Sequence, residues 1–211
     1  MAERTLFVGD VHGCAQELAL LLEATAPRRV ILLGDLFRKG PDPAGVFALI
    51  EARRCEAILG NHDLRTLKNW GEDKASRQLP ARARAWLAAL PLSLSGRRPD
   101  GQPWIAVHAG VHPTLGLAAT PRSQAVSMRR WPDDADPANP FWWQRYTGEA
   151  LVIYGHDAMR GLQDHRPRTL GLDSGCVYGG ALTGYLLEDD ALHAIPAAAV
   201  YRPTEPGPPA P

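Results

Sequence analysis

The sequence predicts an α/β fold built on parallel strands, and three short segments near its start carry that prediction. They are apolar runs, rich in β-branched or aromatic residues, that end in glycine: residues 5–9, 30–34 and 57–60. Such runs are typical of parallel strands that are buried on both faces. Between them, apolar residues recur at helical spacing over residues 14–25 and 47–50. The repeat is therefore β-α-β-α-β, with roughly the thirty residues per unit that such a crossover needs.

Each of these predicted strands is followed by side chains that can bind a metal or transfer a proton. They are, in chain order, Asp10, His12, Asp35, Asn61, His62 and Asp63. Parallel strands bring their carboxyl ends to one edge of a sheet, where ligands bind, so we expect these side chains to converge. A single Gly-Asp after a strand is usually a turn or a helix cap. Three successive strand ends with carboxylate, imidazole and amide groups favour a functional site instead.

Two later strands are predicted to end in histidine. Residues 92–96 and 103–109 predict a pair of strands around a polar turn, and the second strand ends at His108. Residues 150–156 predict another buried strand, which ends at His156. A lone histidine at such a position is more often structural. Because three earlier strand ends show the same pattern, we expect both histidines to be metal ligands.

Length, composition and charge limit the class of protein. With 211 residues, 45% of them apolar, the chain can bury a substantial core, and we expect a single domain over residues 1–201. Lys+Arg and Asp+Glu balance at 23 each, so net charge predicts neither a nucleic-acid nor a membrane partner. The first residues lack a signal-peptide pattern and no run reaches membrane-spanning length. Three cysteines without paired spacing fit a reducing cytoplasm, and we expect that location.

Four segments are predicted to lie outside the central strands. Residues 64–95 look helical and would form a small cap over the mouth of the site, although most of their basic residues are expected on an ordinary solvated face. Residues 111–146 are rich in proline, lack periodicity and predict an irregular lid. Residues 185–195 predict a closing hairpin. The proline-rich end, residues 202–211, is predicted to be a disordered tail.

The predicted lid contains Trp142, Trp143 and Tyr146. These aromatic rings could stack on a nucleobase. They fit equally well as side chains that fill the edge of the core, and the sequence leaves both interpretations open.

The strand-end residues together form a set of oxygen and nitrogen donors without a thiolate. The candidate ligands are Asp10, His12, Asp35, Asn61, His108 and His156. Such a set suits manganese, iron or zinc, disfavours a structural zinc site and is large enough for two ions. Two ions roughly 3.5–4 Å apart need a bridging carboxylate, and Asp35 is the natural candidate. His62 adjoins a ligand without being needed as one, so it is the candidate general acid, with Asp63 as the residue that would orient it.

Five motifs, in their order along the chain, resemble those of calcineurin-like metallophosphoesterases. They are Gly9-Asp-Val-His-Gly13, Gly34-Asp-(x)4-Gly-Pro41, Gly60-Asn-His-Asp63, His108-Ala-Gly110 and Gly155-His156. The segments Gly60–Leu64 and Leu172–Thr183 are similar to the bacterial branch that contains symmetrical diadenosine tetraphosphate hydrolases and small phosphoprotein-phosphatase-like enzymes. The resemblance covers about residues 5–195, and five ordered motifs are together highly specific.

This resemblance implies a four-layer α/β/β/α sandwich and a site for two divalent ions. One ion would be held by Asp10, His12 and Asp35. The other would be held by Asp35, Asn61, His108 and His156. It also implies His62 as the acid, and hydrolysis of the tetraphosphate to two ADP by a hydroxide that bridges the ions, usually with manganese or cobalt.

The second motif departs from the protein serine/threonine phosphatases of this superfamily. Those enzymes carry Asp-Arg-Gly where this chain has Arg38-Lys39-Gly40. The aspartate that would buttress the catalytic histidine is missing, and Lys39 keeps the positive charge without the bidentate fork of arginine. This departure favours nucleotides over phosphoproteins. The other phosphate-binding arginine has no secure counterpart, and Arg130 is our first candidate and Arg145 our second.

Two other functions compete with dinucleotide hydrolysis. The first is a phosphoprotein phosphatase, which an open groove at the lid would favour, whereas a closed, basic and aromatic pocket would favour nucleotides. The second is a metal-dependent binding module that has lost catalysis. The complete set of predicted ligands, together with His62, argues against such a loss.

Overall fold

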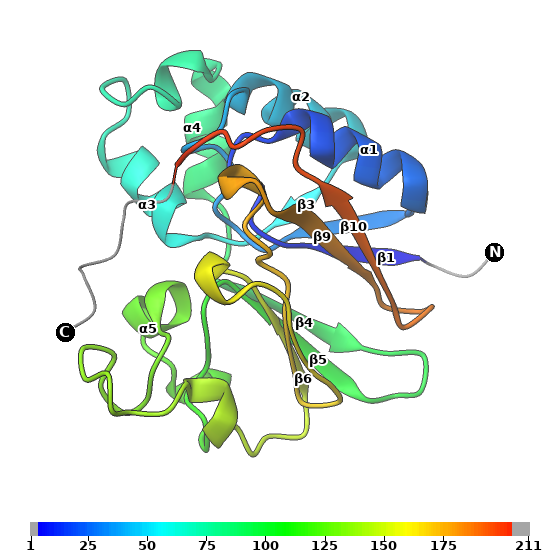
Figure 1. The fold of residues 1–211 in the computed structure, drawn as a ribbon, viewed down its shortest axis with the longest axis vertical. Coiled ribbons are helices and arrows are strands. Elements are labelled where there is room, and N and C mark those ends of the chain that lie inside the picture. Colours follow the sequence, from blue (N-terminus) through cyan, green and yellow to red (C-terminus); the bar gives the residue numbers. More distant parts are fainter. Residues whose placement is uncertain (1–3, 204–211) are drawn as a thin grey trace.

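The protein is a sandwich of two mixed β-sheets with helices on both outer faces (Figure 1). The computed structural model describes residues 4–203. Within them the first sheet has the strand order β10-β9-β1-β2-β3 and the second the order β4-β5-β6-β8-β7. Helices α1 and α2 cover the outer face of the first sheet, and α5 lies on the outer side of the second. This arrangement is the predicted four-layer α/β/β/α sandwich.

The first sheet is formed by both ends of the chain. Its strands are β1 (Thr5–Val8), β2 (Arg29–Leu32), β3 (Glu56–Ala57), β9 (Ala181–Leu186) and β10 (Ala191–Pro196). Strands β1, β2 and β3 are parallel, as the three apolar runs predict. Strand β9 lies antiparallel to β1 and pairs with β10 in the predicted closing hairpin. Strand β3 is shorter than its apolar run, because Leu59 N already donates to Pro91 O at 2.9 Å, outside the sheet.

The second sheet brings the two histidine-terminated strands together. Its strands are β4 (Ser93–Arg97), β5 (Pro103–Val107), β6 (Leu151–Tyr154), β7 (Gln163–His165) and β8 (Thr169–Gly171). Strands β5, β6 and β8 are parallel neighbours, so their carboxyl ends share one edge. Strands β4 and β7 pair antiparallel on either side.

The helices are short, and most of them belong to the first half of the chain. They are α1 (Ala15–Thr25), α2 (Pro43–Arg53), α3 (Asn61–Lys68), α4 (Ala81–Ala88) and α5 (Arg122–Ser127). Single 3₁₀ turns add η1 (Ser76–Gln78), η2 (Leu117–Ala119), η3 (Trp142–Arg145), η4 (Ala158–Arg160) and η5 (Cys176–Tyr178). No helix in the described part of the chain is long and apolar enough to cross a membrane.

The predicted cap and lid segments are only partly regular. Residues 64–95 comprise the rest of α3, a loop with η1, helix α4 and the first residues of β4. Residues 111–146 hold α5 and two 3₁₀ turns between irregular stretches. Of the predicted tail, Arg202 and Pro203 are described, and residues 204–211 lie outside the described residues.

Alternating side chains divide the core into layers. On β1, Leu6 and Val8 belong to the apolar layer beneath α1 and α2, whereas Phe7 belongs to the layer between the sheets. There the Phe7 ring packs edge-on against Trp104, with ring centroids 5.0 Å apart, and also contacts Tyr185. This central layer fixes the position of one sheet on the other, and therefore the relative position of their carboxyl edges.

Replacing Phe7 by alanine removes the ring that joins the sheets. Phe7 is completely buried, so we expect the free energy of unfolding to fall by about 3–5 kcal/mol, as for other buried aromatic-to-alanine changes. Urea unfolding followed by circular dichroism measures the loss. Leu115, which is 68% exposed, is the control, and Leu115→Ala should change the same quantity by less than about 0.5 kcal/mol. Equal losses in the two variants would contradict this account of the central layer.

Candidate active site

Loops at the carboxyl edges of both sheets bring the predicted ligands together. Asp10 and His12 follow β1, and Asp35 follows β2. His12 Nε2 lies 3.6 Å from Asp35 Oδ2 and 3.9 Å from Asp10 Oδ2. The second sheet contributes His108 and His156, whose rings lie 5.1 Å apart between centroids. Asn61 begins α3 and completes the set of six, so all of the predicted ligands lie in one region.

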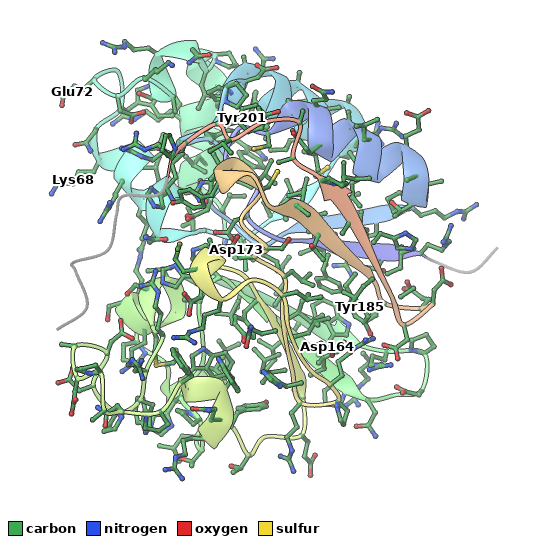
Figure 2. The ribbon with its side chains drawn as sticks, in the orientation of Figure 1. Lys68, Glu72, Asp164, Asp173, Tyr185 and Tyr201 are labelled. Carbon is green, nitrogen blue, oxygen red and sulfur yellow. The ribbon has the colours of Figure 1, made fainter. Side chains whose placement is uncertain are left out.

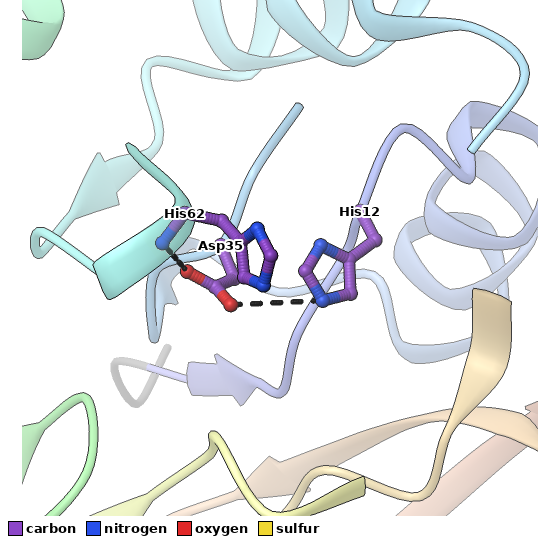
Figure 3. A group of neighbouring side chains, drawn as sticks. All are labelled: His12, Asp35 and His62. Atoms are coloured by element: carbon purple, nitrogen blue, oxygen red, sulfur yellow. Dashed lines mark hydrogen bonds and ion pairs between the residues drawn. The ribbon is translucent and has the colours of Figure 1, made fainter. Parts of the chain in front are cut away.

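Asp35 lies at the centre of this cluster (Figure 3). Its Oδ2 faces His12 at 3.6 Å, and its Oδ1 lies 3.5 Å from His108 Nε2. Oδ1 also accepts a hydrogen bond from the backbone N–H of His62 at 2.8 Å. Two groups of close potential ligand atoms share this carboxylate: Asp10, Asp35 and His108, and His12, Asp35 and His62. Asp35 is thus the residue that the two groups have in common, and the assignment of the other residues to one ion or the other stays a prediction.

The tautomers of the histidines leave lone pairs that face one another. His108 Nδ1 lies 2.7 Å from Leu33 O and therefore carries a proton, which it donates. In a neutral ring, Nε2 then has a lone pair, and this atom lies 3.1 Å from Asn61 Oδ1. His156 Nε2 likewise donates to Ser127 O at 3.0 Å, which leaves its Nδ1 without a proton. A hydrogen bond of this kind from one ring nitrogen is typical of histidines whose other nitrogen binds a metal.

Three of these residues have a strained backbone conformation that the surrounding contacts maintain. His12, Asp35 and His156 have φ angles of 48°, 53° and 75°, in the left-handed region that non-glycine residues rarely adopt. The first two loops are joined by a hydrogen bond from His12 N to Asp35 O at 2.8 Å. Gly60 must lack a side chain, because a Cβ there would lie 2.2 Å from Asp35 Oδ1. Strain of this kind, held by surrounding bonds, is concentrated at functional sites.

Three buried carboxylates make the site strongly favourable for cations. Burial, together with the negative charges of Asp173 and Asp35, raises the pKa of Asp10 well above its ordinary value. Burial opposes ionisation of Asp35 too, but the neighbouring histidines outweigh it and hold the pKa of Asp35 below its usual range. Burial raises the pKa of Asp173 to about 6. A divalent cation among these groups would relieve their repulsion, so the residues present fit a metal centre.

Asp173 was not predicted from the sequence. It is 4% exposed and lines the same cavity as His12 and Asp35, close enough to Asp10 to affect its charge. It lies two residues after β8, the third parallel strand of the second sheet. Its position after a strand is the signal that could have found it, but the glycine-rich segment around it indicated only turns.

His62 lies beside the cluster with its ring edge-on to His12, at 5.2 Å between centroids (Figure 3). Its Nδ1 is buried without a hydrogen-bond partner in the described part of the chain. Burial lowers the pKa of His62 to about 4; Asp35 opposes this shift, and cations such as Lys39 and Arg65 add to it. The ring is therefore neutral in the free protein at pH 7. A substrate anion between His62 and these cations would shift its pKa upward.

Asp63, the predicted orienting residue, makes its hydrogen bonds to backbone groups, and none to the His62 ring is found within the described residues. Its carboxylate accepts three backbone hydrogen bonds, from Asp35 N at 2.7 Å, Leu36 N at 2.9 Å and Gly60 N at 3.0 Å. The reason is its place in the first turn of α3, where a side-chain carboxylate meets unpaired backbone N–H groups. Asp63 thus fixes the turn that carries Asp35.

One of the three predicted substrate contacts lies in the site. Lys39 Nζ is 3.0 Å from His12 Nε2 and 5.1 Å from the centre of the Tyr178 ring. Arg130 instead donates to Asn139 O and lies over the Phe141 ring at 4.3 Å. Arg145 is exposed on η3 and lines none of the cavities described here.

Arg129, the residue before the one predicted, lines the cavity at the predicted metal ligands. Its Nε lies 3.4 Å from Asp157 Oδ1, on the loop after His156. The lid has no periodicity, so the sequence could not show which of two adjacent arginines faces inward. The lid aromatics follow the core interpretation, since Trp142 and Tyr146 are buried and Trp143 stacks on His165 with centroids 4.2 Å apart.

Two adjoining cavities open at the site. The smaller, of about 290 Å³, is lined by ligand candidates such as His12, Asp35 and His156. The larger, of about 840 Å³, lies between α3, the loop before α4 and the last described residues. Lys39 and His62 line both cavities, so the two form one continuous space around them.

With this geometry in place, comparison with known proteins defines the class: the chain belongs to the calcineurin-like phosphoesterase family, whose model matches residues 3–194. It is 31% identical to the symmetrical bis(5'-nucleosyl)-tetraphosphatase of Paracidovorax citrulli (strain AAC00-1), over 83% of this chain and 89% of that protein. It is 24% identical to a bis(5'-nucleosyl)-tetraphosphatase PrpE of Geobacillus sp. (strain WCH70), named asymmetrical, over 93% of this chain and 95% of that one. A crystal structure described as a "putative diadenosine tetraphosphatase" superposes with a TM-score of 0.82 at 30% identity, over 92% of this chain and 94% of that chain.

The structural role of Asp63 can be tested by Asp63→Ala. This change leaves three buried N–H groups without an acceptor, so we expect the free energy of unfolding to fall by about 3 kcal/mol or more. Asp42→Ala is the matched control: Asp42 caps α2 with a single exposed bond to Gly45 N, and its loss should cost about 1 kcal/mol. Urea unfolding measures both. If Asp63→Ala lost activity while its stability stayed unchanged, the result would favour the predicted role of Asp63 in orienting His62.

Proposed function

We propose that this metallophosphoesterase hydrolyses dinucleoside polyphosphates and cleaves diadenosine tetraphosphate symmetrically into two ADP. The observation that carries the proposal is the cluster around Asp35, in which carboxylate, amide and imidazole lone pairs face one another inside a buried site. The curated relative of 31% identity and the well-superposing structure carry names of tetraphosphatases, which supports this substrate class.

Two divalent ions are proposed to occupy the cluster. The ligands would be Asp10, His12, Asp35, Asn61, His108 and His156. Bound there, the ions would lower the pKa of water and neutralise charge on the phosphoryl oxygens. Manganese is our first choice, with cobalt, iron and zinc as alternatives, because the donor set mixes oxygen and imidazole nitrogen without thiolate.

The chain's own residues would bind the polyphosphate and supply the proton. Lys39 and Arg129 line the cavity on different sides and would bind phosphoryl oxygens as cations. His62 would give its proton to the leaving oxygen, because it adjoins the ligands and faces both cavities. The anionic substrate would supply the negative charge that raises the pKa of this ring.

We propose further that the chain acts as one domain, with residues 64–95 as its cap and residues 111–146 as its lid. A small nucleotide is its proposed partner, rather than a nucleic acid or a membrane. A cytoplasmic location is also proposed. The three free, buried cysteines fit the reducing compartment expected from the sequence.

Product analysis tests this function. Purified protein with manganese is given diadenosine tetraphosphate, a phosphopeptide and p-nitrophenyl phosphate, and nucleotides are separated by ion exchange. We expect ADP as the only nucleotide product, no turnover after chelation, and recovery on adding manganese. ATP and AMP in equal amounts would overturn the symmetrical cleavage. Rapid turnover of phosphopeptide with the dinucleotide untouched would overturn the substrate class and favour a phosphoprotein phosphatase.

The His62→Ala variant tests the proposed acid. We expect kcat to fall roughly 10²- to 10⁴-fold, the usual contribution of a positioned acid. Bound metal, measured by mass spectrometry of the isolated protein, should stay at the parent stoichiometry, because all six proposed ligands are intact. His165→Ala, at an exposed histidine stacked on Trp143, is the control and should keep the parent rate. Parent-like hydrolysis by His62→Ala would exclude this residue as the acid.

A further inference from the structure

The larger cavity is much more basic than the rest of the protein. Its lining contains five cationic side chains and one carboxylate, although the whole chain has 23 of each kind. The cations are Arg38, Lys39, Arg65, Lys74 and Arg202. A cavity lined by one sign of charge attracts ligands of the opposite sign. The occupant that this lining favours is therefore an anion with several charges.

Three of these cations are available for a ligand. Arg38 Nη1 lies 3.4 Å from Asp73 Oδ2, the carboxylate in the lining, and Lys39 contacts His12. By contrast, Arg65, Lys74 and Arg202 form no ion pair within residues 4–203. All three are exposed at the wall of the cavity. They come from α3, from the loop before η1 and from the C-terminal segment, so their charges surround the opening from different elements.

We propose that this cavity binds the nucleoside diphosphate half that leaves when the tetraphosphate is cleaved. This inference rests on the proposed function and assigns the two halves of its substrate to different cavities. A general acid must lie within reach of the leaving oxygen. Since His62 lines both cavities, a chain that continues beyond that oxygen enters the larger one. Its volume of about 840 Å³ falls within the roughly 300–1,000 Å³ of typical small-molecule sites.

The C-terminal segment, which forms one wall of the larger cavity, is held in place by hydrogen bonds. Tyr201, labelled in Figure 2, donates its hydroxyl to Glu17 Oε1 at 2.7 Å, and Glu17 is 1% exposed. The same carboxylate oxygen accepts from Ala198 N at 2.9 Å, and Arg202 N donates to Val177 O at 2.9 Å. The end of the described chain is thus fastened to α1 and η5. Tyr201 and Tyr178 provide aromatic surface for a base, and the free cations provide contacts for its phosphates.

On this assignment, the two cavities would bind different parts of the substrate. The smaller one would hold the phosphoryl group under attack, with the ligand cluster and Arg129. The larger one would hold a group that is present in a dinucleotide and absent from a simple aryl phosphate. Its residues should consequently affect the KM for the dinucleotide and the affinity for the product ADP, and they should set the preference between the two substrates.

The double variant Arg65→Ala/Lys74→Ala tests this assignment. Lys68→Ala is the matched control, because Lys68 is an exposed cation one turn further along α3, does not line the cavity and lies at the outer edge of the molecule in Figure 2. Calorimetric titration with ADP should show at least a tenfold weaker Kd for the double variant than for the control. The ratio of kcat/KM for diadenosine tetraphosphate to that for p-nitrophenyl phosphate should also fall at least tenfold.

The outcomes separate this inference from the proposed function. If the parent protein hydrolyses the dinucleotide and the double variant keeps both the Kd for ADP and the substrate ratio within twofold of Lys68→Ala, the cavity is not the leaving-group site. If the parent leaves the dinucleotide intact, the proposed function fails. In that case a tenfold loss of ADP affinity in the double variant would still identify a nucleoside diphosphate site. An unchanged Kd for ADP would overturn the assignment of this cavity to a nucleoside diphosphate too.

Discussion

The site depends on the contacts made by the carboxylate of Asp35. This carboxylate faces His12 from the first sheet and His108 from the second, and accepts a hydrogen bond from the backbone of His62. Its own backbone adopts a left-handed turn, which Asp63 stabilises by accepting the N–H of Asp35. One buried negative charge thus determines where the other donors must lie. Burial raises the pKa of Asp35, but the neighbouring histidines and the backbone N–H of His62 outweigh it and hold this pKa below its usual range.

Because Asp35 contacts groups from both sheets, the site exists only while the two sheets are packed together. The carboxyl edges meet because the central apolar layer, with Phe7 against Trp104, aligns one sheet on the other. The catalytic geometry is therefore a property of the whole sandwich and of no single βα unit. It follows that the buried carboxylates, which disfavour one another, are held close together by the hydrophobic packing of the core.

Most of the fold, and the place where the proposed ligands gather, could be predicted because they depend on local patterns. Short apolar runs located β1, β2, β5 and β6, and the residues after these strands converge as parallel topology requires. The sequence did not predict features that depend on the direction in which a side chain points, or on contacts between residues far apart in the chain. The sequence could not distinguish Arg129 from Arg130 in an aperiodic lid, or foresee that Asp63 would cap a helix. Nor could it show that Arg65 and Arg202, far apart in sequence, line one cavity.

The fastening of Tyr201 to Glu17 also has a practical consequence for handling this protein. Pro203, two residues further on, still lines the larger cavity, so the described part of the chain ends at the rim of the cavity that we assign to a nucleotide. Arg4 lies at the amino end of β1, opposite the carboxyl edge, and is tied to Asp189 by a 2.7 Å ion pair. The described part of the chain therefore begins on the side away from the chemistry, and an amino-terminal tag is the better choice for kinetic work.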